Sequence, residues 1–441
     1  MLSSSFLSLP SFRNVLVSSA IIRIALILYS EWHDARSAVK YTDVDYRVFS
    51  DAASFLLHPG PGNANHAQGP LRTLFGPISE VGDPYTRETY RYTPLLALLL
   101  APNGWLHPAF GKYVFALCDI VNGVIIYQLL KTEILPGHMA LQKEKKSAKA
   151  TKPRFSNDWV ERWSTIYASF HLLNPLVFSI STRGSSESVL SLFVLLTLYA
   201  SLNGRWDTTA ILLGLSTHWK IYPIIYGVGC LGVVGGSGRE VRSFMDYVKT
   251  LINLKTFRFT LISAGTFIAL GVGCYAIWGY PFLYESYLYH LHRLDHRHNF
   301  SPYFYLTYLT YPSLLAKFQP LNVWSQILRS PLTSFVPQMG LALGLGLLFG
   351  RRKEDLVFTW FVQTCVFVIF NKVCTSQVSD LKHVRTSSSL VTLNGSCSTF
   401  CGISCCYRSC FPNCRSRVGS PRYMSAFGSE RRLCGSAKPT N

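Results

Sequence analysis

The feature that most constrains this chain is a series of apolar stretches, each close to the length of a membrane-spanning helix. Most of them contain 15 to 20 residues, and a helix needs about 20 to cross roughly 30 Å of hydrocarbon. Only 15% of residues are charged, against about 25% in ordinary soluble proteins. A polytopic, all-α membrane protein is therefore expected, with spans at 15–29, 114–130, 166–180, 189–202, 261–278, 341–349 and 356–370.

The positive charges indicate how these spans are oriented. The formal net charge is +19, but Lys and Arg lie mainly between apolar stretches rather than in one aromatic-rich patch, so we do not expect a nucleic-acid partner. Residues 131–162 carry eight Lys or Arg, 239–258 carry five, and 351–353 carry three. Because positive loops remain on the cytosolic side, we assign all three segments there. The first span lacks an A-x-A cleavage site and contains Arg23, which favours an uncleaved helix.

This orientation places three polar segments together on the opposite face: 31–92, 183–188 and 279–304. The apolar stretch 208–234 is interrupted by His218, Lys220 and Pro223. We expect two broken or re-entrant helices there, whose turn at 218–223 reaches that same face, because irregular backbone at membrane depth must be buried or line a cavity. The aromatic run 303–311 is more typical of an interfacial helix than of a span.

The composition changes after residue 377. Residues 378–441 are rich in Ser, Cys, Gly and Arg and contain seven of the twelve cysteines, without a spacing typical of a zinc site. We expect this tail to be disordered, or to result from a shifted reading frame or an unspliced intron. The domain organisation expected is thus a membrane domain, 1–377, followed by the tail.

Two carboxylates, Asp43 and Asp45, follow the first span directly. In an extended segment they would lie on one side, since alternate side chains of a strand point the same way. A solvated loop also explains an isolated D-x-D pair. At a membrane boundary, however, partial desolvation can raise the pKa of a carboxyl toward the working range of a general base.

A cluster of cationic and imidazole side chains follows in the second polar loop, in the sequence HLHRLDHRHNF. It contains Asp295, His296, Arg297 and His298. The Arg and His side chains suit an anionic phosphate better than a metal, because His292 and His296 are only two ligands. An interfacial loop meeting lipid headgroups is the alternative. His218 and Lys220 in the broken helix are further candidates, since ionisable groups at membrane depth are costly. Arg91, flanked by two tyrosines, is either a ligand or an interfacial anchor.

Six motifs in order resemble the GPI mannosyltransferase I family: TDVDYRVFSDAA, TYRYTPLLA, HLLNPLVFSISTRGSSES, THWKIYPIIY, HRLDHRHNFSPYFY and FNKVCTSQ. The resemblance implies a GT-C fold with about eight or more spans in the endoplasmic reticulum membrane and a luminal site. It implies transfer of the first α1,4-linked mannose from dolichyl phosphate mannose to glucosaminyl-(acyl)phosphatidylinositol, and a small stabilising membrane subunit.

An α-linked product from a β-linked donor implies an inverting displacement. One carboxylate then deprotonates the acceptor hydroxyl, while cations stabilise the departing phosphate. We assign Asp43 as the base and Asp45 to acceptor hydroxyls or a metal, with the two roles exchangeable. Arg91, His218, Lys220, Asp295, His296, Arg297 and His298 are the substrate-binding candidates, and no metal site is assigned, although a divalent metal remains open. The alternatives are an inactive truncated family member and a polytopic lipid transporter, although no inverted repeat is visible.

Overall fold

The computed structural model describes residues 11–62, 65–75, 81–137, 157–236, 244–293, 301–310, 323–324, 327 and 330–371. Over these ranges the regular structure is helical, and the β-type pairing is limited to a bridge between His66 and Gly82. The first half contains α1 (Phe12–Arg36), α2 (Val44–Leu57), α3 (Pro70–Phe75), η3 (Pro84–Thr86), α4 (Pro94–Leu99), η4 (Ala101–Asn103), α5 (Phe110–Leu129), η5 (Leu130–Ile134), α7 (Asn157–Leu172), α8 (Pro175–Arg183) and α9 (Glu187–Leu202). The second half contains α10 (Trp206–Trp219), α11 (Ile224–Gly236), α12 (Phe244–Leu251), α13 (Leu254–Trp278), α14 (Tyr280–Leu283), η6 (Tyr284–Leu288), α15 (Tyr289–His292), α16 (Phe304–Thr310), α18 (Pro331–Phe349), η8 (Lys353–Asp355) and α19 (Leu356–Ile369).

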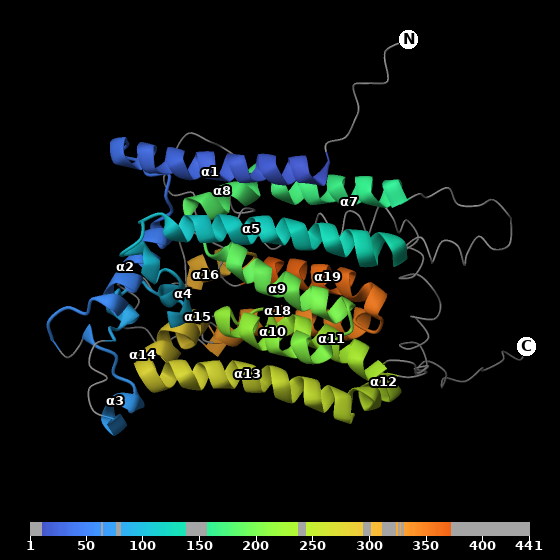
Figure 1. Ribbon diagram of the computed structural model, residues 1–441. Coiled ribbons are helices and arrows are strands. Elements are labelled where there is room, and N and C mark those ends of the chain that lie inside the picture. Colours follow the sequence, from blue (N-terminus) through green and yellow to red (C-terminus); the bar gives the residue numbers. More distant parts are fainter. Residues whose placement is uncertain are drawn as a thin grey trace, which may run out of the picture.

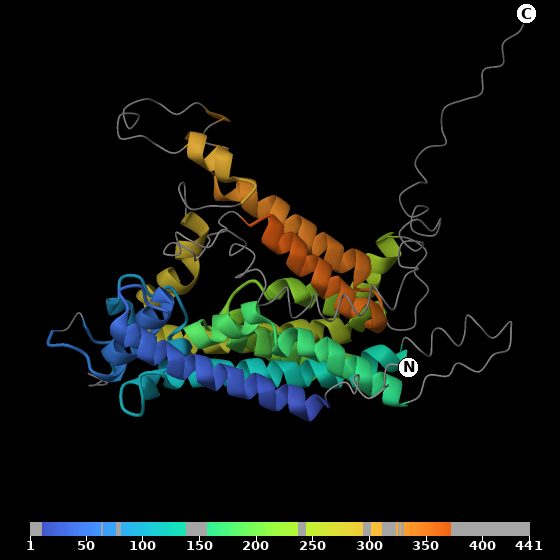
Figure 2. The ribbon, with the colours of Figure 1, turned by 90° about the horizontal axis from the view of Figure 1, so that it is seen from above.

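The long helices α1, α5, α9, α10 and α13 run side by side, and the short helices α2, α3, α4, α14 and α15 gather at one end of them (Figure 1). The described parts of the polar segments 31–92 and 279–304 therefore share one end of the bundle, as the sequence predicts. The helix α12 and the segment around η8 lie at the other end. In the second view, α18 and α19 pack against each other and stand away from the layer formed by the long helices (Figure 2).

Three helical segments among the described residues are long and apolar enough to cross a membrane: 12–36, 110–137 and 254–278. The consecutive helices α8 and α9 qualify as a fourth if they form one span, although they are bent by 119°. This matches the predicted spans near the N-terminus, at 114–130 and at 261–278. The resemblance implies eight or more spans, and the part of the chain that the structure describes contains fewer candidate spans than that.

One predicted span is wrong. The stretch 166–180 is not a continuous helix, because α7 ends at Leu172 and α8 begins at Pro175. Proline lacks the backbone N–H that a helix interior requires and so favours a helix start. The side chain of Asn174 caps the new helix by accepting a hydrogen bond of 3.0 Å from the backbone N–H of Leu176. Hydrophobicity alone concealed this break.

The predicted interruption of 208–234 is confirmed. Helix α10 ends at Trp219 and α11 begins at Ile224, with Lys220 in an extended conformation between them. The break lies at the same end as the two polar segments, since His218 contacts Thr93, which directly follows the first segment, and Tyr287 of the second. The expected helix within 303–311 is also present, as the seven residues of α16.

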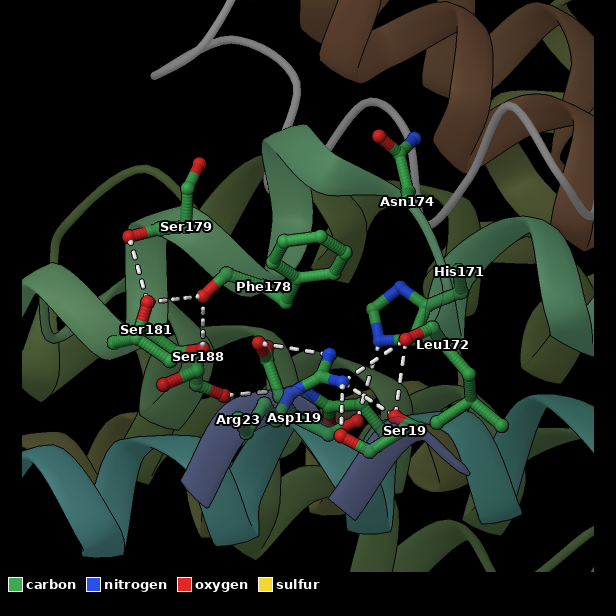
Figure 3. A network of polar contacts seen from close by, with 12 residues as sticks. Ser19, Arg23, Asp119, His171, Leu172, Asn174, Phe178, Ser179, Ser181 and Ser188 are labelled. Atoms are coloured by element: carbon green, nitrogen blue, oxygen red, sulfur yellow. Dashed lines mark hydrogen bonds and ion pairs between the residues drawn. The ribbon is translucent and has the colours of Figure 1, made fainter. Parts of the chain in front are cut away.

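Inside the bundle, Arg23 of α1 is fully buried and forms an ion pair with Asp119 of α5, with Nη2 and Oδ2 3.3 Å apart (Figure 3). The Arg23 guanidinium also donates a 2.9 Å hydrogen bond to the carbonyl of Leu172, and another to the hydroxyl of Ser19. Isolated charges are very costly in an apolar interior, so pairing explains how a helix of this kind carries an arginine. The network joins α1, α5 and the end of α7.

An apolar cluster lies beneath the end where the short helices gather. Its buried members include Phe49 of α2, Leu96 of α4, Phe115 of α5, Leu190 of α9 and Trp278 of α13. Burial of such side chains contributes about 1.5–3 kcal/mol each. The cluster thus fixes the positions of the short helices on which the candidate site residues lie.

Candidate functional site

The two aspartates lie at the start of a helix. Asp43 is the N-cap of α2, with extended dihedrals (φ −63°, ψ 148°), and its carboxylate accepts a 3.4 Å hydrogen bond from the backbone N–H of Asp45. Asp45 belongs to the first turn of the helix. The expectation that both occupy an extended segment is therefore wrong, because Asp43 satisfies an otherwise unpaired N–H group of the helix and ends the extended chain there.

Asp45 is half-buried and lies against the first polar segment. The hydroxyl of Tyr92 donates a 3.3 Å hydrogen bond to its Oδ2 atom. Burial, and then the negative charge of Asp43, raise the pKa of the Asp45 carboxyl above its ordinary value, while the hydrogen bond from Tyr92 and the positive charge of Lys220 act in the opposite direction. A carboxylate with a raised pKa is a better proton acceptor than a solvated one.

The turn between α8 and α9 holds this helix start in place. The backbone N–H of Asp43 donates a 3.0 Å hydrogen bond to the carbonyl of Arg183, and the Arg183 Nε atom donates one of 3.1 Å to the carbonyl of Tyr41. Gly184 follows with φ +96°, and a Cβ atom there would lie only 2.4 Å from Cδ2 of Tyr46. Glycine is required by both the left-handed conformation and the close approach.

The same turn leads to an ion pair between Glu187 and Lys220. Glu187 is in the first turn of α9, and its carboxylate contacts the ammonium group of Lys220 at the break between α10 and α11. The side chain of Glu187 is 14% exposed and that of Lys220 is 33% exposed. The pair is therefore partly shielded from solvent, although Lys220 remains partly accessible to solvent. Both charges act on Asp45.

His218, two residues before Lys220, is buried and links the residue after the first polar segment to the second segment. Its Nε2 atom lies 3.1 Å from Oγ1 of Thr93, and its Nδ1 atom lies 3.0 Å from the hydroxyl of Tyr287. That hydroxyl also donates to the carbonyl of His218. Since both ring nitrogens contact protein groups, His218 orients its neighbours and is not the side chain best placed to meet a substrate.

Arg91 connects the first segment to the second. Its guanidinium forms an ion pair with Glu285 and lies over the ring of Tyr289, 4.1 Å from its centroid. Its carbonyl lies 3.2 Å from Nε2 of His290. The Tyr289 contact is a cation–π interaction, worth about 0.5–2 kcal/mol. Burial lowers the pKa of His290, which favours the neutral imidazole. The structure thus brings Asp43, Asp45, Arg91, His218 and Lys220 to one end of the bundle.

Comparison with known proteins gives this arrangement a context. The mannosyltransferase (PIG-M) family profile matches residues 180–379. GPI mannosyltransferase 1 of Emericella nidulans is 38% identical over 81% of this chain and 75% of its own length, and that of Debaryomyces hansenii is 39% identical over 83% and 78%. The GPI α-1,4-mannosyltransferase I catalytic subunit of Danio rerio is 37% identical over 82% of this chain and 76% of its own length.

The chain belongs to the GPI mannosyltransferase 1 family. It is accordingly a glycosyltransferase of GPI-anchor biosynthesis, and its apolar helices fit a membrane protein. Four predicted site residues, Asp295, His296, Arg297 and His298, lie outside the described residues. Within the described ranges, no group of three or more His, Cys, Asp or Glu side chains is arranged to hold a metal ion.

Sequence reasoning missed several residues that this family member brings to the site. Glu187 pairs with Lys220, Glu285 pairs with Arg91, and Tyr92 binds Asp45. A signal was available for Glu187, since a carboxylate in the short polar segment 183–188 lies on the same face as the aspartates. Tyr92 lies inside a motif quoted above and Glu285 lies in the polar segment 279–304, but their partners are 47 and 194 residues away and cannot be read from spacing.

Proposed function

We propose that this protein transfers the first α1,4-linked mannose from dolichyl phosphate mannose to glucosaminyl-(acyl)phosphatidylinositol, with inversion at the sugar carbon. The observation that carries the proposal is the environment of Asp45: a half-buried carboxyl with a raised pKa, bound by Tyr92 and facing an ion-paired lysine. A base and a cation near one another are what such a displacement needs.

In the mechanism we propose, Asp45 is the base, the role assigned to Asp43 from sequence, and Asp43 holds the helix start. The Asp45 carboxylate takes the proton of the acceptor 4-hydroxyl as that oxygen forms a bond to C1 of mannose. The bond from C1 to the phosphate oxygen breaks, and its electron pair leaves with dolichyl phosphate. Because phosphate leaves without protonation, no second carboxylic acid is required.

Lys220 is the described cation best placed to stabilise the departing phosphate, since it is partly exposed and acts electrostatically on Asp45. Arg91 is engaged by Glu285 and Tyr289, which supports a role in holding the two polar segments together more than a role as phosphate ligand. His296, Arg297 and His298 remain proposed phosphate ligands on the strength of their chemistry alone, and Asp295 remains a proposed substrate-binding residue.

The wider setting is part of the same proposal. We place the enzyme in the endoplasmic reticulum membrane as a GT-C protein with about eight or more spans, its site facing the lumen, together with a small stabilising membrane subunit. The catalytic domain is residues 1–377, which agrees with a family match ending at residue 379. The tail 378–441, proposed to be disordered or a gene-model artefact, lies outside the described residues.

The test is mannose transfer from radiolabelled dolichyl phosphate mannose to a glucosaminyl lipid in microsomes that contain the full chain. Asp45→Ala and Asp43→Ala are expected to abolish transfer while the amount of membrane-inserted protein stays unchanged. Full activity of the double variant would overturn the assignment. Absence of transfer by the unaltered chain, with transfer by a relative measured in parallel, would favour an inactive family member.

A further inference from the structure

We propose that Glu187 binds the protonated amine of the acceptor sugar, and that the Glu187–Lys220 ion pair is the substrate-free arrangement of two groups that separate on binding. The carboxylate then holds the acceptor ammonium, and Lys220 holds the donor phosphate. This inference rests on the proposed function, because that function supplies an acceptor with a free amine and a donor with a phosphate.

The position of Glu187 is the first argument. It lies in the first turn of α9, directly after the turn that binds the backbone of Asp43, and its charge acts on Asp45. A sugar whose 4-hydroxyl reaches Asp45 has its 2-amine within the same ring. A carboxylate close to the base can therefore contact the 2-amine of a sugar whose 4-hydroxyl contacts the base, and so select an amino sugar.

The local balance of charge is the second argument. Among the described residues, the carboxylates of Asp43 and Glu187 and the ammonium of Lys220 act electrostatically on Asp45. Arg183 donates to the carbonyl of Tyr41, and Arg91 is paired with Glu285. If Lys220 moves to a phosphate, the partly buried Glu187 loses its ion-pair partner among the described residues, which is costly. An ammonium group on the acceptor offsets that cost, whereas a hydroxyl does not.

This exchange of ion pairs has a consequence for substrate binding. Each substrate must displace one partner of the pair, and the first to bind frees the other partner for the second substrate. Donor and acceptor should therefore strengthen each other's binding, and the reciprocity is required by thermodynamic linkage. A purely structural ion pair would produce neither this synergy nor a preference for an amine.

The experiment compares two acceptors in the full-length protein reconstituted in nanodiscs: a short-chain glucosaminyl phosphatidylinositol and the matched glucosyl lipid with a hydroxyl in place of the amine. For Glu187→Gln, the ratio of kcat/KM for the amino acceptor to that for the hydroxyl acceptor is expected to fall about tenfold or more, the loss typical of a charged hydrogen bond. Glu161→Gln is the matched control, since Glu161 pairs with Lys131 near the other end of the bundle.

A binding measurement without donor separates this inference from the proposed function. Lys220→Met is expected to tighten binding of the amino lipid, because Glu187 is released, and Glu187→Gln is expected to weaken it. An equal loss with both acceptors in Glu187→Gln, or unchanged amino-lipid binding in both variants, would overturn the inference. If the unaltered chain binds the amino lipid selectively and transfers no mannose, the proposed function fails and the role of Glu187 stands.

Discussion

Arg23 and Asp119 are separated by 96 residues in sequence, yet their side chains meet inside the helix bundle, 3.3 Å apart and almost fully enclosed. Leaving either charge without the other in this interior is expected to cost about 3–5 kcal/mol. Arg23→Ala or Asp119→Ala should therefore lower the thermal stability of the detergent-solubilised protein sharply.

The double variant Arg23→Met/Asp119→Leu tests whether the cost comes from the unpaired charge. Because an apolar pair of similar volume often replaces a buried ion pair without loss, this variant should be more stable than either single alanine variant. Equal or greater loss of stability in the double variant would contradict this interpretation.

The rate of mannose transfer should depend on pH through Asp45. Since a base must be ionised and the folded-state pKa of Asp45 is raised, activity should fall as the pH drops through a value above the ordinary pKa of aspartate. Tyr92→Phe removes a hydrogen bond that lowers this pKa, so the acid limb of the kcat/KM profile should move to higher pH. Asp43→Asn removes a charge that raises the pKa while keeping a helix cap, so the limb should move to lower pH. Shifts of the same sign in both variants would exclude Asp45 as the titrating group.

Thr42 is expected to position the aspartates. Its backbone N–H and hydroxyl bind Asp34 at the end of α1, and its hydroxyl accepts a 2.6 Å hydrogen bond from Lys112. Thr42→Val leaves the carboxylate of Asp34 and the ammonium of Lys112 without the Thr42 hydroxyl, which costs about 1.5–3 kcal/mol. We expect kcat to fall roughly tenfold or more, with little change in KM. Thr42→Ser keeps the hydroxyl and should restore most of kcat. Equal damage by both substitutions would point to packing of the methyl group instead.

Gly184→Ala should destabilise the turn that holds Asp43. The left-handed conformation alone costs about 1–2 kcal/mol for a residue with a Cβ atom, and the contact with Tyr46 adds to it. Gly204→Ala is the control, since Gly204 also has a positive φ of 71° but no atom within 4 Å of an added Cβ. A greater loss of melting temperature and of transfer is expected at Gly184, and equal effects at the two positions would exclude the clash.

Patterns local in sequence predicted a good part of this architecture. The apolar stretches and the basic loops located three long helices, the break at Lys220 and the end of the bundle where the polar segments meet. The start of α2 at Asp43 was also readable, because aspartate is a preferred N-cap, but the D-x-D spacing suggested a strand. Pairings between distant residues were beyond such patterns: hydropathy marks Arg23 as unusual, yet only packing selects Asp119 as its partner.

The contacts around the site also bear on its biogenesis. Ser286 binds the carbonyl of Tyr92, and Tyr287 binds His218, so the second polar segment closes an arrangement whose aspartates are made some 240 residues earlier. A nascent chain that has not yet inserted α13 holds Asp43, Asp45 and Lys220 without these supports. On the proposed mechanism, competence for sugar transfer is therefore a late event of membrane insertion, and an incompletely translated chain is not expected to transfer mannose.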